Sequence, residues 1–256
     1  MFMKPLIIIP TYNERENIGE MISLIFKEAG QYSPDILVVD SASPDKTAEK
    51  VRECQKEYSG VHLLEQTAKL GLGRAYLDGM RWALERDYEF LITMDADFSH
   101  HPCYLAPMLN RAENADLVIG SRYVEGGELK NWPKRRKALS QFANWYARTL
   151  TGLPFSDLTS GFHCFRRQLL KKVLRYKIHA DGYAFLIELK FLSILQGARF
   201  DEIPIVFSDR TKGDSKISKR VILESMLIVI LRSIHRGRIR KLVREVRSDK
   251  VYAGAS

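Results

Sequence analysis

The feature that most restricts the fold of this 256-residue chain is the alternation of short apolar runs with helical patterns in its N-terminal half. The runs LIII at 6–9 and DILVVD at 35–40 are almost continuously apolar, which is typical of strands buried on both faces of a sheet. Between them, apolar residues recur at helical spacing up to Gly30. The pattern predicts strands at 6–9, 35–40, 61–64, 90–94 and 116–123, and helices at 13–30, 43–58 and 73–87. We therefore predict an α/β fold with a mostly parallel central sheet flanked by helices.

Beyond residue 124 the alternation is less regular. A polar, basic loop at 125–140 leads into a helix that ends near Leu150. The remaining segments are predicted as a strand or loop at 160–167, an apolar helix at 182–197, a strand at 199–207, a basic loop at 209–216 and a helical tail. No linker or internal repeat separates them, so we predict one domain over 1–215 and a C-terminal helical extension over 216–256.

Charge and cysteine content narrow the class of protein. The formal net charge of +9 favours an anionic partner, such as nucleic acid, a phosphate or an acidic membrane surface. The three cysteines lie far apart and form no CxxC pair, which argues for a reducing compartment and against a thiolate zinc site. The longest apolar run, 221–231, falls well short of the ~20 residues that span a bilayer. We expect no transmembrane helix.

Polar side chains follow several of the predicted strands. Asp95 and Asp97 come directly after the strand at 90–94. The other strands are followed by Thr11 with Tyr12, by Asp40, and by Ser121 with Arg122. In parallel sheets, ligands bind at the carboxyl ends of the strands, so we expect these side chains to converge. Two carboxylates with only oxygen ligands suit Mg²⁺ or Mn²⁺, although a lone DxD is also typical of a solvated turn.

Other cofactor signatures are absent from the sequence. The segment GLGRAYLDG has Tyr76 where a dinucleotide-binding motif needs its third glycine, and no GxxxxGK[ST] motif occurs. The pair His100–His101 has no further His or Cys at zinc spacing, so we predict a cap or turn for it.

Seven motifs in order give the chain a recognisable resemblance over about residues 5 to 216. They are IPTYNERENI, VVDSASPDKT, MDADFSHHP, GSRY, SGFHCFRR, GYAFLIE and DRTKGDSK. This series resembles the family 2 glycosyltransferases of GT-A fold, and within them the dolichyl-phosphate or polyprenyl-phosphate mannose synthases. The resemblance implies transfer of mannose from GDP-mannose to a dolichyl or polyprenyl phosphate, with Mg²⁺ or Mn²⁺ as cofactor.

The resemblance also implies roles for individual residues. For the nucleotide sugar it implies Pro10, Tyr12, Glu14, Asp40, Asp95, Asp97, Arg210 and Lys216. For the acceptor phosphate it implies Arg122, Arg136 and Ser140, and for the metal Asp95 and Asp97, with Ser99 where some relatives have Gln. Asp97, Arg122, Arg136 and Arg210 are the implied catalytic residues, and Glu188 is a possible acid or base. One departure is Ser41, which stands where the family usually has a second Asp.

Chemical reasoning supports these roles. Breaking a sugar–diphosphate bond develops negative charge, which a divalent cation and basic residues stabilise. An acceptor phosphate, with a second pKa near ~6, is mostly a dianion at neutral pH and needs no strong base. Guanidinium groups bind phosphate oxygens in pairs, which suits Arg122 and Arg136. Attack from the opposite face inverts the anomeric centre.

Simpler interpretations exist for several of these residues. Arg136 lies in KRRK, a sequence typical of a solvated turn, and Lys216 suits a helix cap. Glu188 is equally well interpreted as a buried, paired acid. For Trp132 and Trp145 we predict core packing rather than a lipid groove.

The tail is basic and amphipathic. Residues 232–250 contain many Lys and Arg, with Ile234, Ile239, Leu242, Val243 and Val246 near helical spacing. Such a helix is typical of membrane-surface anchors, and its alternatives are a solvated helix or an oligomer contact. We expect peripheral association with the cytoplasmic face of a membrane, and the resemblance leaves open a membrane-anchoring partner protein.

Three other functions remain as alternatives. The first is transfer of glucose or N-acetylglucosamine from a UDP-sugar, to a polyprenyl phosphate or to a sugar hydroxyl. The second is a basic nucleic-acid-binding module, against which stand the acidic strand ends and the absence of a known reader motif. The third is an inactive scaffold, which the intact Asp95, Asp97 and Arg210 disfavour. We expect no nucleic-acid partner.

Overall fold

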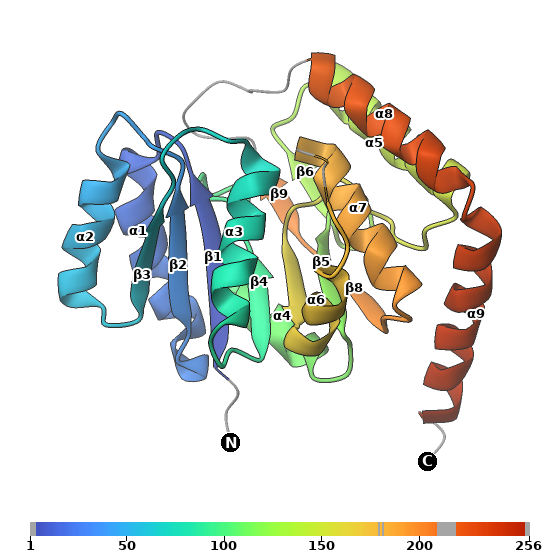
Figure 1. Cartoon of the computed structure of the whole chain (residues 1–256), viewed down its shortest axis with the longest axis horizontal. Helices are drawn as coiled ribbons and strands as arrows, with labels where there is room; N and C mark the ends of the chain where they lie inside the picture. The colour runs from blue at the N-terminus through green and yellow to red at the C-terminus, as the bar shows by residue number, and fades with distance from the viewer. Residues whose placement is uncertain (1–3, 179, 181, 209–218, 254–256) are drawn as a thin grey trace.

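The computed structural model describes residues 4–178, 180, 182–208 and 219–253 (Figure 1). In this part of the chain a seven-stranded sheet has the order β3-β2-β1-β4-β7-β5-β8. The strands are β1 (Pro5–Thr11), β2 (Asp35–Asp40), β3 (Val61–Glu65), β4 (Phe90–Thr93), β5 (Leu117–Ser121), β7 (His163–Arg166) and β8 (Phe200–Pro204). Only β7, which lies between β4 and β5, is antiparallel to its neighbours. The predicted mostly parallel α/β sheet is confirmed.

Helices cover both faces of this sheet (Figure 1). They are α1 (Arg15–Ala29), α2 (Thr47–Glu57), α3 (Leu72–Leu84), α4 (Leu105–Ala112), α5 (Lys134–Thr151), α6 (Arg167–Val173), α7 (Gly182–Leu195), α8 (Lys219–Ser233) and α9 (Arg236–Ala253). Helices α1, α2 and α4 pack on one face, and α3, α6 and α7 pack on the other.

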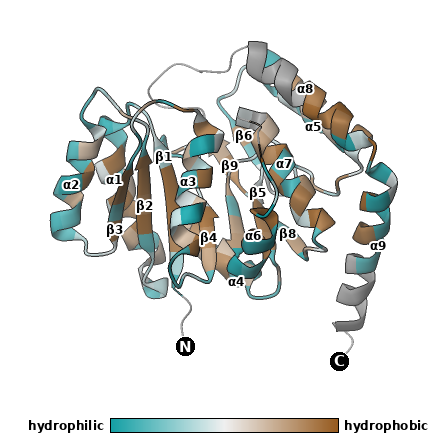
Figure 2. Cartoon of the chain, in the orientation of Figure 1, coloured by the Kyte–Doolittle hydropathy of each residue, from teal (hydrophilic) through white to brown (hydrophobic). Residues whose placement is uncertain are grey.

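The alternation of side chains along β1 explains why its sequence is continuously apolar. Leu6 and Ile8 belong to the core shared with α3 and α7, whereas Ile7 and Ile9 belong to the core shared with α1 and α4. All four side chains are fully buried. Figure 2 shows β1 and β2 as hydrophobic along their length, while the helices carry hydrophilic residues on their outer sides.

Three boundaries differ from the sequence prediction. Helix α2 begins at Thr47 and not near 43, because Lys46 before it has a left-handed backbone with φ of 69°. The Asp45 carboxylate accepts a hydrogen bond from the Thr47 N–H and holds this turn. Part of the predicted loop at 125–140 is helical, since α5 already begins at Lys134. The predicted strand at 199–207 is divided at Ile205, after which β9 (Val206–Ser208) leaves the main sheet and pairs with β6 (Glu128–Lys130).

The C-terminal helices share a core with the rest of the protein. Helices α8 and α9 pack against α5 and α7, and Val229 and Ile239 are buried there. Leu242 and Val243 also pack against this core. The apolar stripe that we interpreted as a membrane anchor therefore packs against the protein at Ile239, Leu242 and Val243, whereas Ile234 is 80% exposed. Attachment of the tail to a membrane stays a prediction. The predicted domain boundary at 215/216 lies outside the described residues.

Among the described helices, none combines the length and the apolar character that crossing a bilayer requires.

Candidate active site

A cavity of about 380 Å³ opens at the carboxyl ends of β1, β4 and β5. These strands run in the same direction, so the residues that follow them meet at one edge of the sheet. The predicted site residues that line the cavity are Pro10, Tyr12, Glu14, Asp95, Asp97, Arg122 and Arg136. The sheet therefore brings together side chains that are more than 100 positions apart in the sequence.

A hydrogen bond from Tyr76 orients the carboxylate of Asp95. The Tyr76 hydroxyl, which is fully buried, donates a hydrogen bond of 3.0 Å to Asp95 Oδ1. Burial first, and then the charge of Asp95, raise the pKa of Tyr76 well above its usual range, so this phenol stays protonated and donating. The backbone N–H of Asp95 donates to Nδ1 of His100 over 3.2 Å.

His100 and His101 shape the turn after β4. The His100 ring is buried and stacks on Phe162, and burial lowers its pKa, which keeps Nδ1 free of a proton and able to accept. His101 accepts a hydrogen bond from the Cys103 N–H at the start of the 3₁₀ turn Pro102–Tyr104. The predicted cap or turn role of this pair is confirmed.

Asp97 lies deeper than Asp95 and is almost fully buried. Its Oδ1 accepts hydrogen bonds from the backbone N–H and the hydroxyl of Ser99. Phe98 between them has φ of 61°, a left-handed conformation that a bulky residue adopts at a cost. The surrounding bonds hold the turn in this strained form, which fixes the direction of the Asp97 carboxylate.

Asp95 and Asp97 fit a divalent cation of the Mg²⁺ or Mn²⁺ type. Such ions are often bound by one or two carboxylates and complete their shell with waters and substrate phosphates. Within the described ranges there is no group of three or more His, Cys, Asp or Glu side chains that would enclose a metal. The donor set thus suits a cation held jointly by protein and ligand rather than by protein alone.

Asp40, the last residue of β2, holds the loops that follow β1 and β2 in place and does not line the cavity. The Asp40 carboxylate accepts hydrogen bonds from Thr11 Oγ1 and from the N–H and hydroxyl of Ser43. Ser41, the residue that departs from the family pattern, lines the cavity, whereas Asp40 lies behind it. Lys69 also lines the cavity, with its Nζ 3.6 Å from the centroid of the Tyr12 ring.

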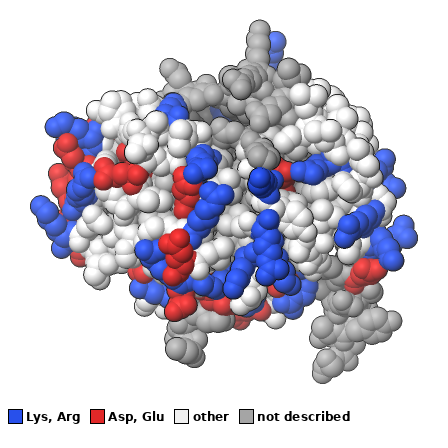
Figure 3. Space-filling view, viewed as in Figure 1, with Lys and Arg blue, Asp and Glu red and all other residues white. Residues whose placement is uncertain are grey.

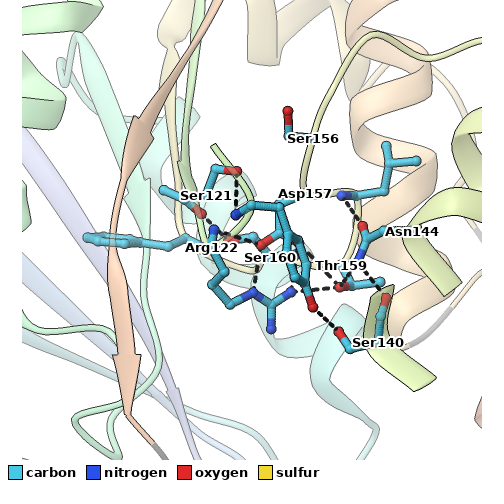
Figure 4. A network of polar contacts seen from close by, with 12 residues as sticks. Ser121, Arg122, Ser140, Asn144, Ser156, Asp157, Thr159 and Ser160 are labelled. Carbon is cyan, nitrogen blue, oxygen red and sulfur yellow. Dashed lines mark hydrogen bonds and ion pairs between the residues drawn. The ribbon is translucent and has the colours of Figure 1, made fainter. Parts of the chain in front are cut away.

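On the other side of the cavity, Arg122 forms a buried ion pair with Asp157 (Figure 4). Nε and Nη2 of Arg122 each lie 2.6 Å from a different Asp157 oxygen, and Nη2 also donates to Thr159 Oγ1 over 2.7 Å. Burial opposes ionisation of Asp157, but the charge of Arg122 and its hydrogen bonds outweigh it and lower the pKa. The arginine is therefore held rigidly, with much of its charge balanced.

The segment that carries Asp157 is supported by three other elements. Glu202 of β8 accepts from the backbone N–H groups of Ser156 and Asp157, and Asn144 of α5 accepts from that of Leu158. Lys190 of α7 is fully buried and donates to the carbonyl oxygens of Leu158 (3.1 Å) and Ser160 (2.8 Å). Burial lowers the pKa of Lys190 to about 7.

Arg136 and Ser140 lie on the first turns of α5. The Arg136 guanidinium stacks on Trp132, 3.8 Å from the ring centroid, and both side chains line the cavity. Ser140 lies outside the lining and accepts a hydrogen bond from the Tyr123 hydroxyl over 2.7 Å. Trp145, predicted to pack in the core, has 61% of its surface exposed, so that prediction is wrong.

The other predicted residues lie away from this cavity or outside the described chain. Glu188 is buried on α7, is not part of the lining and forms an ion pair with Arg232 of α8. Its placement agrees with the simpler interpretation of a buried, paired acid. Arg210 and Lys216 lie outside the described residues.

Four residues that build the site were not predicted from the sequence. Lys69 and Tyr76 flank the GLGRA segment, which is an incomplete dinucleotide motif. Asp157 and Lys190 act on partners at least 30 positions away. The one local signal is a lysine inside the mostly apolar segment 182–195.

Replacing Asp157 with Asn should destabilise the protein by about 3–5 kcal/mol, since it leaves the buried Arg122 without its counter-charge. Urea denaturation at neutral pH measures this. The matched control is Asp201→Asn, whose exposed pair with Arg111 should contribute at most about 1 kcal/mol.

The lowered pKa of Asp157 also predicts how the stability of the wild type relative to this variant depends on pH. Because the folded pKa of Asp157 is lowered, its contribution is present above the unfolded pKa of about 3.9 and is lost as the pH falls through the folded value. The stability difference between wild type and Asp157→Asn should therefore shrink on acidification. A constant difference would contradict an ionised Asp157.

Comparison with known proteins places the chain in a family. Residues 6–174 match the family Glycosyl transferase family 2. The chain is 43% identical to the polyprenol monophosphomannose synthase of Mycolicibacterium smegmatis over 238 residues, covering 92% of this chain and 89% of that protein. It is 41% identical to the undecaprenyl-phosphate mannosyltransferase of Micrococcus luteus over 227 residues, covering 89% and 93%.

Among solved structures, glucosyl-3-phosphoglycerate synthase from Mycobacterium tuberculosis, in complex with Mn²⁺, UDP-glucose and glycerol 3-phosphate, has a TM-score of 0.64. The match covers 90% of this chain and 80% of that one at 16% identity, so this likeness concerns the fold. The chain belongs to glycosyl transferase family 2 and is a glycosyltransferase of GT-A fold.

Proposed function

We propose that the protein transfers mannose from GDP-mannose to a polyprenyl phosphate such as dolichyl phosphate, with inversion at the anomeric carbon. The observation that carries this proposal is a single cavity whose lining includes the carboxylates of Asp95 and Asp97 and the guanidinium groups of Arg122 and Arg136. Such a cavity suits a metal-bound diphosphate donor and a phosphate acceptor. The names of the two relatives above support the sugar and the lipid.

On the donor side, the nucleotide diphosphate lies against Pro10, Tyr12 and Glu14 and reaches Asp95 and Asp97. A divalent cation bound there supplies positive charge to the leaving diphosphate. Tyr76 and the turn around Ser99 keep the two carboxylates oriented, so little reorganisation is needed when substrate binds. Arg210 and Lys216 remain predicted donor residues.

On the acceptor side, Arg122 and Arg136 bind the lipid phosphate. Arg122 contributes a fixed hydrogen-bonding geometry more than net positive charge, because the Asp157 carboxylate neutralises its charge. The rings of Tyr123, Trp132 and Phe207 surround its guanidinium group. Arg136, held flat on Trp132, supplies the second guanidinium group. Ser140 acts indirectly, because its hydroxyl accepts the hydrogen bond that positions Tyr123.

A phosphate acceptor agrees with the position of Glu188. A sugar hydroxyl would need a general base next to the acceptor, but the Glu188 carboxylate is paired with Arg232 outside the cavity lining. A phosphate dianion attacks without losing a proton. This favours a lipid phosphate over a hydroxyl, while a UDP-sugar donor remains the second candidate because Ser41 replaces the usual acid beside the base.

For membrane association we propose a different surface from the tail stripe. Helices α5 and α8 pack side by side and expose large apolar side chains (Figure 1). These residues, which we call the α5–α8 surface, are Leu139, Phe142, Trp145, Met226, Leu227, Ile230 and Leu231. Contiguous exposed apolar residues of this size mark interaction sites, and a bilayer is the source of the proposed acceptor.

Asp97→Asn should reduce transfer from GDP-mannose to polyprenyl phosphate by about 10²-fold or more, because it weakens charge stabilisation at the leaving diphosphate. Calorimetry should also show loss of Mn²⁺ binding in the presence of GDP, with the thermal midpoint unchanged. Asp87→Asn, at an exposed position, is the control. Normal transfer and Mn²⁺ binding by Asp97→Asn would overturn the metal assignment.

Glu188→Gln should retain most transfer activity, with a loss far below the about 10²–10⁴-fold that removal of a general base causes. Because this change also disturbs the pair with Arg232, thermal stability is measured in parallel and rates are compared well below the unfolding midpoint. A loss of several hundredfold in a folded variant would favour a hydroxyl acceptor.

Leu231→Glu should weaken binding to phosphatidylcholine vesicles about tenfold, since it places a charge on the α5–α8 surface. Tyr176→Glu, at an exposed aromatic residue after α6, is the control. Vesicle sedimentation measures both, and equal losses would count against this surface.

A further inference from the structure

A second hollow lies between α5 and α9, apart from the cavity that holds Asp95 and Asp97. Its volume is about 700 Å³, and three of its lining residues are Arg148 on α5 and Arg236 and Arg240 on α9. Among the described residues, no acidic side chain is part of the lining. Figure 3 shows a group of basic side chains at the edge of the molecule formed by α9. The hollow is thus basic, whereas the active-site cavity combines both signs of charge.

The charge in this hollow is unbalanced. Arg122, Arg166 and Arg199 each lie within 4.0 Å of a carboxylate. In contrast, no such partner occurs for Arg148, Arg236 or Arg240 anywhere in the part of the chain that is described. Like charges gathered without a counter-charge repel one another, and a bound anion relieves this repulsion.

Arg236 gives a second, independent indication. Its Nε is buried and has no hydrogen-bond acceptor among the described residues. A buried donor without an acceptor costs free energy unless a ligand or water supplies one. An oxyanion in the hollow would provide that acceptor.

The glycine that ends α5 allows the arginines to lie close to this helix. Gly152 has φ of +73°, and a Cβ atom there would lie 3.1 Å from Cγ of Arg236 and 3.4 Å from Cγ of Arg240. The stems of the two arginines therefore occupy the space of a side chain. An arginine near a helix C-terminus also stabilises the helix dipole, so this alternative has to be separated by experiment.

The location of the hollow identifies the source of the anion. Trp145 lines it and also belongs to the α5–α8 surface, with 61% of the side chain exposed. Tryptophan is enriched at the interface between a bilayer and water, because its ring is apolar and its N–H group is polar. With the α5–α8 surface on the bilayer, the hollow lies at its border, where lipid phosphates are found.

We propose that Arg148, Arg236 and Arg240 form a binding site for the phosphate of an anionic phospholipid headgroup, separate from the acceptor-phosphate site. This proposal rests on the membrane association proposed above. It implies that the protein distinguishes anionic from neutral bilayers through a defined pocket, in addition to the apolar contact made by α5 and α8.

The test uses the full chain and vesicles of phosphatidylcholine with or without phosphatidylglycerol, at physiological salt. Arg236→Gln and Arg240→Gln should each weaken binding to the phosphatidylglycerol vesicles about fivefold, the ratio that corresponds to about 1 kcal/mol per basic residue, and leave binding to phosphatidylcholine unchanged. Arg238→Gln is the matched control, because Arg238 is exposed on the same helix and outside the lining. It removes the same charge and should change binding less than twofold.

Three outcomes would overturn the proposal. Equal losses in Arg238→Gln and Arg236→Gln would mean diffuse attraction without a pocket. A lower thermal midpoint in Arg236→Gln with unchanged vesicle binding would mean that the arginines only stabilise the end of α5. Release from vesicles by millimolar inorganic phosphate, dependent on Arg236, would mean a site for free phosphate rather than a headgroup.

The proposed reaction is tested separately from this site. Arg236→Gln should transfer mannose to a short, detergent-soluble polyprenyl phosphate at the wild-type rate, since Arg236 does not line the active-site cavity. If the wild type shows no such transfer but the vesicle result holds, the proposed function fails and the lipid site stands.

Discussion

The part of the cavity that we propose binds the acceptor phosphate depends on the buried ion pair between Arg122 and Asp157. Arg122 follows β5, and Asp157 lies in a segment that has no regular structure of its own. That segment is kept in place by Lys190, Glu202 and Asn144, which come from α7, β8 and α5. Because two charges buried away from water are stable only when both partners are present, the pair fixes the position of the arginine and of the chain around it.

The donor end is organised by a different principle. Asp95 and Asp97 follow a buried parallel strand, and their directions are set by hydrogen bonds from Tyr76, His100 and Ser99. One cavity thus combines a rigid, ion-paired arginine with two carboxylates whose directions are set by hydrogen bonds. In the proposed reaction, the carboxylates would hold a cation at the diphosphate and the arginine would face the acceptor phosphate.

The C-terminal helices connect this chemistry to the surface of the molecule. Glu188 and Lys190 lie two positions apart on α7 and so point to different sides of the helix, one to Arg232 on α8 and the other to the segment beside Asp157. Helix α7 therefore links the acceptor site to α8. Ile239 and its neighbours on α9 are used in the core, whereas α5 and α8 expose large apolar side chains.

The sequence by itself determined the α/β sheet, the places of its first five predicted strands along the chain and the convergence of residues at their carboxyl ends. These features follow from local periodicity, which every strand and helix carries in its own residues. Only the tertiary structure decided that Asp157 pairs with Arg122, that Lys190 holds a loop 30 positions away and that Glu188 faces α8. It also decided that Ile239, Leu242 and Val243 of the tail stripe pack inward. An amphipathic pattern indicates that one face of a helix is apolar but not which element packs on it. Likewise, the sequence does not show which distant residue neutralises a given charge. Both are properties of the packed chain.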